Sequence, residues 1–85
     1  METDKVIKYP LATEKSIRLM ESENKMIFVV ENSATKEEIK KAIEGMFKAK
    51  VEKVNTSILK SQKRAYVKFS KETPAIDIAT NLGLM

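Results

Sequence analysis

The side chains that most clearly suggest a chemical role are the basic residues of one segment, positions 48–71. This segment holds eight Lys or Arg residues and a single acidic residue, Glu52. Lys and Arg neutralise phosphates, while Asn, Ser and Thr donate hydrogen bonds to phosphate or sugar oxygens. The segment therefore indicates a surface that binds phosphate groups of the kind a nucleic acid backbone presents. Its basic residues are Lys48, Lys50, Lys53, Lys60, Lys63, Arg64, Lys68 and Lys71.

The spacing within this segment places some of these groups together. In a strand over 64–69, Arg64, Tyr66 and Lys68 share one face because strand side chains alternate. Tyr66 can stack on a base or ribose, or it can simply cover part of a sheet. The charge also has a second interpretation, because lysines on an edge hairpin prevent the addition of further strands. On charge alone, both interpretations remain open.

Most catalytic and metal-binding chemistry is excluded by composition. The chain has no Cys and no His, which removes disulfides, zinc fingers, haem histidines and the Ser-His-Asp and Cys-His constellations. Two Gly residues cannot form a glycine-rich phosphate loop. Glu21 and Glu23 beside Asn24 offer oxygen ligands for a divalent cation, but a solvated turn is the simpler interpretation. We therefore expect no enzyme activity, no cofactor, no metal and no small-molecule substrate.

The first half of the chain predicts two strands around a short helix. Residues 5–9 indicate a strand that Pro10 stops. Thr13 can cap a helix that runs to about Glu21. Residues 25–30 form a β-rich run that is apolar on both faces, which is typical of a central strand.

The strongest helix pattern covers residues 35–48. Thr35 and Glu38 have the spacing of a capping box, in which each side chain accepts from the other residue's backbone N–H. Gly45 weakens the helix by roughly 1 kcal/mol relative to Ala. The apolar stripe has helical spacing and consists of Ile39, Ala42, Ile43, Met46 and Phe47.

The second half predicts an antiparallel hairpin and a last helix. Residues 51–59 and 64–69 alternate as two strands. Thr73 is expected to cap the helix, with Pro74 in its first turn and Gly83 at its stop.

The expected order β-α-β-α-β-β-α defines an α+β sandwich, a small and mostly antiparallel four-stranded sheet packed with helices. A chain of 85 residues with net charge +4 should form one domain over 1–85. Its longest apolar run, Met26 to Val30, cannot span a membrane. The first residues show no signal sequence, so we expect a cytoplasmic protein with no membrane partner.

A short match to another RNA-binding fold does not extend to the order of the elements. Residues 65–69, Ala-Tyr-Val-Lys-Phe, resemble the end of the RNA-recognition-motif signature. That motif runs βαββαβ, whereas here a helix follows the second strand. Its first strand also needs a stacking aromatic, which Val6-Ile7-Lys8 lacks.

Several short motifs resemble, in their order and spacing, the large-subunit ribosomal protein family numbered twenty-three in its archaeal and eukaryotic form. The resemblance runs from Tyr9 to Gly83. The motifs are Pro10-Leu11-Ala12-Thr13-Glu14-Lys15, Asn24-Lys25, Ala34-Thr35-Lys36 with Ile39-Lys40 and Ala42-Ile43, Val51 with Val54-Asn55-Thr56, Lys63-Arg64-Ala65-Tyr66-Val67, and Ala75 with Ile78-Ala79 and Leu82-Gly83.

This resemblance implies a protein that binds large-subunit ribosomal RNA beside the mouth of the nascent-polypeptide exit tunnel. A neighbouring small helical ribosomal protein is an implied contact. So is the signal recognition particle, or another factor that meets the emerging chain, with Glu14 as the partner-facing acid. For Thr13, a plain helix cap remains the alternative to an RNA contact. The implied RNA contacts are Lys8, Thr13, Lys15, Lys36, Asn55, Thr56, Lys63, Arg64, Tyr66 and Lys68.

The connection between the last two strands distinguishes this chain from the bacterial members of the family that it resembles. Those members carry a long basic extension between the last two strands, which reaches into the tunnel. Here only residues 59–63 lie between the strands, with a polar turn at 60–63. We therefore expect no loop of this chain to line the tunnel wall.

Two other function classes are alternatives for a small basic domain. The first is a free-standing single-domain RNA-binding protein, which sedimentation of a cell extract would separate from a ribosomal one. The second is a small enzyme of ferredoxin-like architecture, such as an acyl-phosphate hydrolase. Such an enzyme needs a phosphate cradle and an Arg–Asn pair, and the sequence offers only Arg18 and Arg64 with no cradle.

Overall fold

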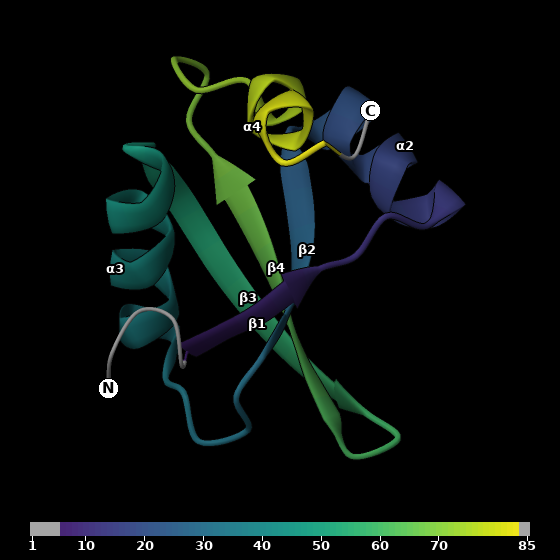
Figure 1. Cartoon of the computed structure of the whole chain (residues 1–85), viewed down its shortest axis with the longest axis vertical. Helices are drawn as coiled ribbons and strands as arrows, with labels where there is room; N and C mark the ends of the chain where they lie inside the picture. The colour runs from purple at the N-terminus through teal and green to yellow at the C-terminus, as the bar shows by residue number, and fades with distance from the viewer. Residues whose placement is uncertain (1–5, 84–85) are drawn as a thin grey trace.

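The computed structural model describes residues 6–83, and its elements follow the order expected from the sequence (Figure 1). The fold is α+β, as predicted. The elements are β1 (Ile7–Pro10), α2 (Glu14–Glu23), β2 (Lys25–Val30), α3 (Lys36–Phe47), β3 (Val51–Leu59), β4 (Gln62–Phe69) and α4 (Ala75–Asn81).

The two longer helices begin at the capping residues that the sequence indicates. Thr13 Oγ1 accepts from the Ser16 N–H at 3.2 Å, and Ser16 Oγ accepts from the Thr13 N–H at 2.8 Å. Thr35 and Glu38 form the predicted box at the start of α3, at 3.2 and 3.1 Å. The hydrogen bond from the Thr35 backbone N–H favours the charged carboxylate and lowers the pKa of Glu38.

The four strands form one antiparallel sheet in the order β1-β2-β4-β3. Strand β2 is therefore central, as its two apolar faces predict. Residues Met26 to Val30 are all buried. On the end strand β1, Pro10 is the last paired residue, opposite Phe28, which is where a strand tolerates a residue without an N–H. Lys5, the first residue of the predicted strand, lies outside the described residues.

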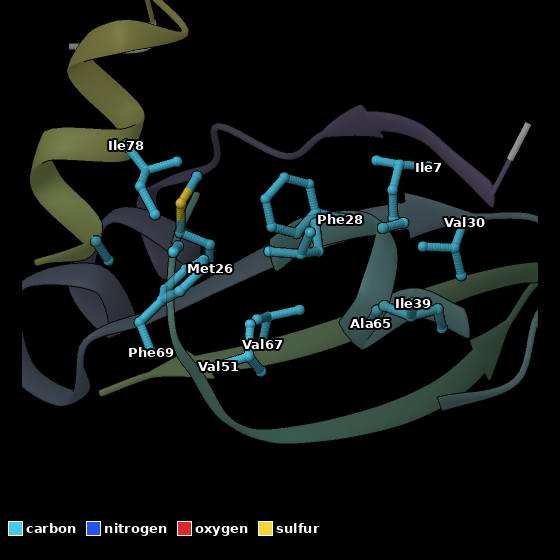
Figure 2. Packing of buried hydrophobic residues seen from close by; sticks show 14 of the residues in the cluster. Ile7, Met26, Phe28, Val30, Ile39, Val51, Ala65, Val67, Phe69 and Ile78 are labelled. Atoms are coloured by element: carbon cyan, nitrogen blue, oxygen red, sulfur yellow. The ribbon is translucent and has the colours of Figure 1, made fainter. Parts of the chain in front are cut away.

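The hydrophobic core lies between one face of this sheet and the helices. Met26, Phe28 and Val30 of β2 point toward Ile39 of α3 and Ile78 of α4 in one cluster (Figure 2). The ring centroids of Phe28 and Phe47 lie 6.1 Å apart. Because helices contribute to this cluster on one face of the sheet, the other sheet face carries the polar and charged side chains of the strands, together with the buried Ile27 and Val29 of β2.

The turn between β3 and β4 is shorter than the sequence pattern suggests. Strand β4 begins at Gln62, so only Lys60 and Ser61 connect the two strands. Both residues have positive φ, 53° and 63°. Two consecutive residues of this kind match the right-handed twist of a hairpin. The expected turn at 60–63 is therefore wrong at its end, because Gln62 and Lys63 pair with Leu59 and Ile58.

The predicted cap of the last helix is also wrong. Pro74 occupies the N-cap of α4 and makes no capping hydrogen bond with its side chain. The acceptor comes instead from Asn24, whose Oδ1 accepts from the Ala75 N–H at 2.6 Å. The Thr73 hydroxyl accepts from the Lys50 N–H at 3.2 Å. The start of α4 is therefore fixed by the end of α2, far away in the sequence.

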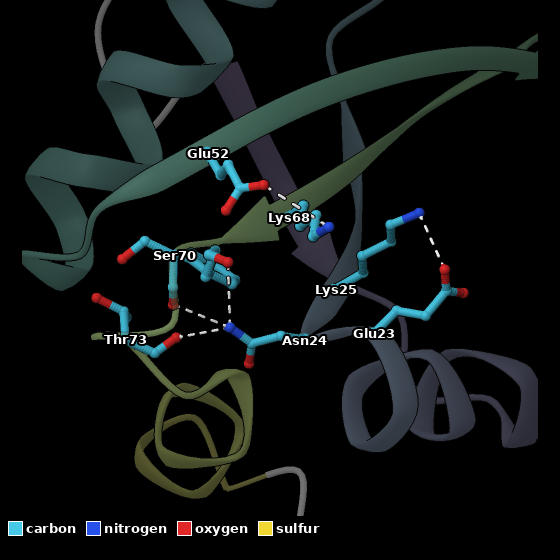
Figure 3. Close-up of polar contacts among 8 residues, drawn as sticks. Glu23, Asn24, Lys25, Glu52, Lys68, Ser70 and Thr73 are labelled. Atoms are coloured by element: carbon cyan, nitrogen blue, oxygen red, sulfur yellow. Dashed lines mark hydrogen bonds and ion pairs between the residues drawn. The ribbon is translucent and has the colours of Figure 1, made fainter.

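Asn24 makes more contacts with the β4–α4 connection than this one bond. Its Nδ2 donates to the carbonyl oxygens of Phe69, Ser70 and Thr73 at 3.1, 3.0 and 3.1 Å (Figure 3). Its backbone is left-handed, with φ 57°, and ends α2. Asparagine tolerates this backbone region better than other residues with side chains. One residue thus ends one helix and begins another.

Replacing Gly45 with Ala should stabilise the protein. The residue lies in α3 with an exposed surface, and an added Cβ meets no atom within 4 Å. Ala lowers the conformational freedom of the unfolded chain, so we expect the thermal midpoint to rise by about 4 °C. Circular dichroism during heating measures this. Gly83→Ala is the matched control and should lower the midpoint, because Gly83 has a φ of +76°. A fall for Gly45→Ala would contradict the reasoning.

Candidate phosphate-binding sheet face

The sheet face opposite the helices, called the open face below, collects polar and charged side chains from all four strands. The register aligns them in rows across the strands. Lys25 of β2, Lys68 of β4 and Lys53 of β3 form one row. The next row consists of Ile27, Tyr66 and Asn55, and the third of Val29, Arg64 and Ser57, with Tyr9 of β1 paired to Val29.

The row of three lysines is the most unusual feature of the open face. Like charges directly opposite each other destabilise a sheet, and here Lys68 has a lysine on each side. Lys25 forms an ion pair with Glu23 at 3.5 Å, and Lys68 forms one with Glu52 at 3.7 Å (Figure 3). Within residues 6–83, Lys53 forms no ion pair. The row therefore offers positive charge to an anion.

The centre of the open face is apolar but is not exposed. Ile27 and Val29 are 3% and 1% exposed and lie outside the helix-covered cluster. Their cross-strand neighbours Tyr66, Arg64 and Tyr9 are long amphipathic side chains on the same face. Such side chains cover apolar surface with their stems and rings while their polar ends stay in water. The open face thus has an apolar floor under a layer of polar ends.

Four of the predicted RNA contacts lie together on the open face. They are Asn55, Arg64, Tyr66 and Lys68. Their grouping agrees with the alternation expected from the sequence. None of them lies in a catalytic cleft, and the arrangement supplies charge, hydrogen-bond donors and one aromatic ring.

Two other predicted contacts lie on the opposite face of the same hairpin. Lys63 is paired with Val30 and Thr56 with Ala65, both on the side of the helices. The Lys63 Nζ donates to the carbonyl oxygens of Ala34 and Asn32 at 2.7 and 3.4 Å. Lys63 therefore ties β4 to the loop before α3, and it does not join Arg64 and Lys68 as the shared segment suggested.

The remaining predicted residues are spread over the surface and are not brought together. Lys8 of β1 is exposed and lies 3.5 Å from Glu31. Thr13, Glu14 and Lys15 lie exposed at the start of α2, and Lys36 lies exposed at the start of α3.

Glu14 has a close partner on its own helix. Its Oε1 lies 2.7 Å from Arg18 Nη2, one turn further along, and both side chains are largely exposed. An exposed pair of this kind contributes little to stability. The Thr13 hydroxyl is occupied as a helix cap. Both residues remain accessible to a partner, and neither is held in a pocket.

Three residues of the open face are not indicated by the sequence, namely Tyr9, Lys25 and Gln62, and Lys53 is indicated only as a member of the basic segment. Lys25 and Lys53 belong to different strands, so their alignment with Lys68 appears only in the register of three strands. Tyr9 and Gln62 are joined by a hydrogen bond of 2.9 Å although they are far apart in the sequence. Period-two alternation along β3 was the one available signal, because it places Lys53 beside Asn55.

Some basic residues of the 48–71 segment do not belong to the open face, and Lys50 is one of them. The Lys50 Nζ lies 2.9 Å from Glu72, and this hydrogen-bonded partner raises the pKa of Lys50.

Among residues 6–83, no three His, Cys, Asp or Glu side chains are grouped as metal ligands would be. No helix in that range is both long and apolar enough to cross a membrane.

The fold and the open face define a small α+β protein whose distinctive chemistry is a cationic sheet surface. The profile of the family described as Ribosomal protein L23 matches residues 5–80. Large ribosomal subunit protein uL23 of Methanococcus vannielii is 47% identical over 85 residues, which cover 99% of both chains. The chain therefore belongs to the ribosomal protein L23 family, in its archaeal type. It is a structural component of the cytoplasmic ribosome and not an enzyme.

Proposed function

We propose that this protein binds large-subunit ribosomal RNA through the open face. The observation that carries the proposal is the row formed by Lys25, Lys68 and Lys53, with Arg64 on the same face. A sheet that sets three like charges side by side loses stability, and phosphate groups of an RNA backbone would offset this loss. The apolar floor and the tyrosines suit contact with ribose and bases.

The wider assignment rests on family membership. The relative from Methanococcus vannielii is a large ribosomal subunit protein, and we place this chain in the large subunit, near the mouth of the nascent-polypeptide exit tunnel. The turn of β3 and β4 contains only Lys60 and Ser61, so this hairpin contributes no long loop to the tunnel. The other predicted RNA contacts, including Lys63 and Lys36, extend the interface beyond the open face.

A second part of the proposal concerns protein partners. A neighbouring small helical ribosomal protein and the signal recognition particle, or another nascent-chain factor, are the expected contacts. The start of α2 is the proposed docking site, because Glu14 is exposed there and its only described ion pair, with Arg18, is an exposed one. Such a pair is easily exchanged for a cation on a partner.

Sedimentation of a cell extract on a sucrose gradient tests both parts. We expect the tagged protein to migrate with the large subunit. Signal recognition particle added to the extract should bind fewer subunits when they carry Glu14→Lys, while incorporation of the variant stays normal. Glu21→Lys, near the other end of α2, is the control for charge reversal, because Glu21 is exposed and makes no ion pair within residues 6–83. A position in the light fractions would instead support a free-standing RNA-binding protein.

A further inference from the structure

A chain of hydrogen bonds between side chains crosses the open face from β4 to β1. Arg64 Nε donates to Gln62 Oε1 at 3.3 Å, and Gln62 Nε2 donates to Tyr9 Oη at 2.9 Å. Arg64 and Tyr9 are the cross-strand neighbours of Val29, one on each side. The chain therefore spans the central strand β2, and within residues 6–83 Gln62 is the one side chain that is hydrogen-bonded to both Arg64 and Tyr9.

The hydrogen bond to Gln62 leaves the two terminal nitrogens of the Arg64 guanidinium available to a ligand. It occupies Nε, whereas the two terminal nitrogens of Arg64 make no hydrogen bond within the described part of the chain. Paired N–H groups of a guanidinium suit a phosphate, which accepts two parallel hydrogen bonds. A half-buried Arg64 that is already held at Nε thus presents donors in a restricted set of directions.

The other end of the chain fixes an aromatic ring. Tyr9 is 47% exposed on the end strand of the sheet. Its hydroxyl accepts from Gln62, which limits the rotation of a side chain that otherwise extends over the sheet edge. Exposed rings on such faces stack on the bases of single-stranded RNA. Gln62 itself carries no charge and already uses both ends of its amide.

We propose that Gln62 is a positioning residue that holds the Arg64 guanidinium and the Tyr9 ring in the arrangement that meets RNA. This proposal rests on the proposed binding of RNA through the open face. Ordering a flexible side chain at an interface lowers affinity by up to about tenfold, and a side chain ordered in advance avoids this loss. Gln62 therefore raises affinity without contributing a charge of its own.

The test measures binding of the protein to protein-free archaeal large-subunit ribosomal RNA over a range of salt concentrations. Gln62→Ala should weaken binding by about fivefold and leave the slope of log affinity against log salt unchanged. Arg64→Gln should weaken binding and lower that slope by about one. Tyr9→Phe keeps the ring but removes the acceptor, and it should cause a smaller loss than Gln62→Ala. Asn32→Ala is the control, since the Asn32 amide donates to Ser61 of the same hairpin but does not reach Arg64.

A double variant shows whether Gln62 acts through Arg64. In the Arg64→Gln background, Gln62→Ala should weaken binding by less than about twofold, because the main positioned group is gone. Full additivity, or an unchanged affinity for Gln62→Ala while Arg64→Gln is impaired, would overturn the positioning role. If Arg64→Gln changes neither the affinity nor the salt slope, the proposal that RNA binds through the open face is overturned, and not only the role of Gln62. The thermal midpoints of all variants show whether unfolding causes the loss of RNA affinity. If Gln62→Ala is unfolded, Tyr9→Phe tests the proposal instead, and an RNA affinity equal to that of the unchanged protein would overturn it.

Discussion

Replacing Asn24 with Ala is expected to cause a large loss of stability. The two N–H groups of Asn24 Nδ2 are shared among three carbonyl oxygens around β4 and α4, and Asn24 Oδ1 accepts from the Ala75 N–H. Ala removes these hydrogen bonds and is disfavoured at a φ of 57°. We expect the free energy of unfolding to fall by about 4 kcal/mol. Small domains have about 5–15 kcal/mol in total, so urea unfolding should detect the change clearly.

Two further variants separate the contributions of Asn24. Asn24→Gly keeps the left-handed backbone at no steric cost, so it should be about 1 kcal/mol more stable than Asn24→Ala. Asn24→Asp retains an acceptor for Ala75 but turns a carboxylate oxygen toward three carbonyl oxygens, so it should be no better than Ala. Asn32→Ala, which removes one exposed bond, should change stability by less than about 0.5 kcal/mol. Equal effects of Asn24→Ala and Asn32→Ala would refute the role of Asn24.

The second large effect is expected on RNA affinity. Exchange of Lys53, Arg64 and Lys68 together for Gln removes three positive charges from the open face. If each neutralises one phosphate, the slope of log affinity against log salt should fall by about two to three. Near 0.1 M salt this corresponds to roughly a 100- to 1,000-fold loss of affinity for protein-free large-subunit ribosomal RNA. Filter binding at several salt concentrations measures both quantities.

Matched variants show whether position or total charge decides this result. Lys40, Lys41 and Lys48 are exposed on α3 and at its C-cap, and their exchange for Gln changes the net charge by the same amount. We expect less than about a threefold loss from this control. Glu52→Gln should act in the opposite direction, because it removes the carboxylate that lies 3.7 Å from Lys68. An equal loss from both triple variants would mean that the open face has no special role.

The triple variant of the open face should also keep its fold. Lys53 and Lys68 are cross-strand neighbours, and Gln at both positions removes a repulsion between like charges. The thermal midpoint should therefore stay the same or rise. A marked fall would assign a structural role to these side chains.

Local patterns predicted much of the fold because the groups involved are close in the sequence. Thr13 and Thr35 are satisfied by residues three positions away, so their spacing alone reveals the helix starts. The burial of β2 on both faces follows in the same way from its apolar run. The role of Asn24 could not be found like this, because its partners lie 45 to 51 residues further along the chain. The residue just before Pro74, Thr73, is the cap that the local pattern predicts, and its hydroxyl accepts instead from the Lys50 N–H.

The candidate site was predicted in part, for a related reason. Alternation within β4 places Arg64, Tyr66 and Lys68 on one face. The same alternation assigns Lys63 to the other face, but a position near a turn and a shared basic segment suggested otherwise. The lysine row depends on the pairing of β2 with β4, which the sequence does not encode in any short motif. Surfaces that are assembled from several strands need the register before they can be described.

The pairing of β2 with β4 has a consequence for how the chain folds. Strands β1 and β2 can pair early around α2, and β3 and β4 can form a local hairpin. The pairing of β2 with β4, in which Lys25 lies opposite Lys68, joins residues far apart in the sequence. Contacts between residues so far apart form slowly because the intervening chain must first be ordered. We therefore expect the two halves to join in a late step that closes the core. The lysine row is completed in that same step, so a chain that has not finished folding does not yet present it.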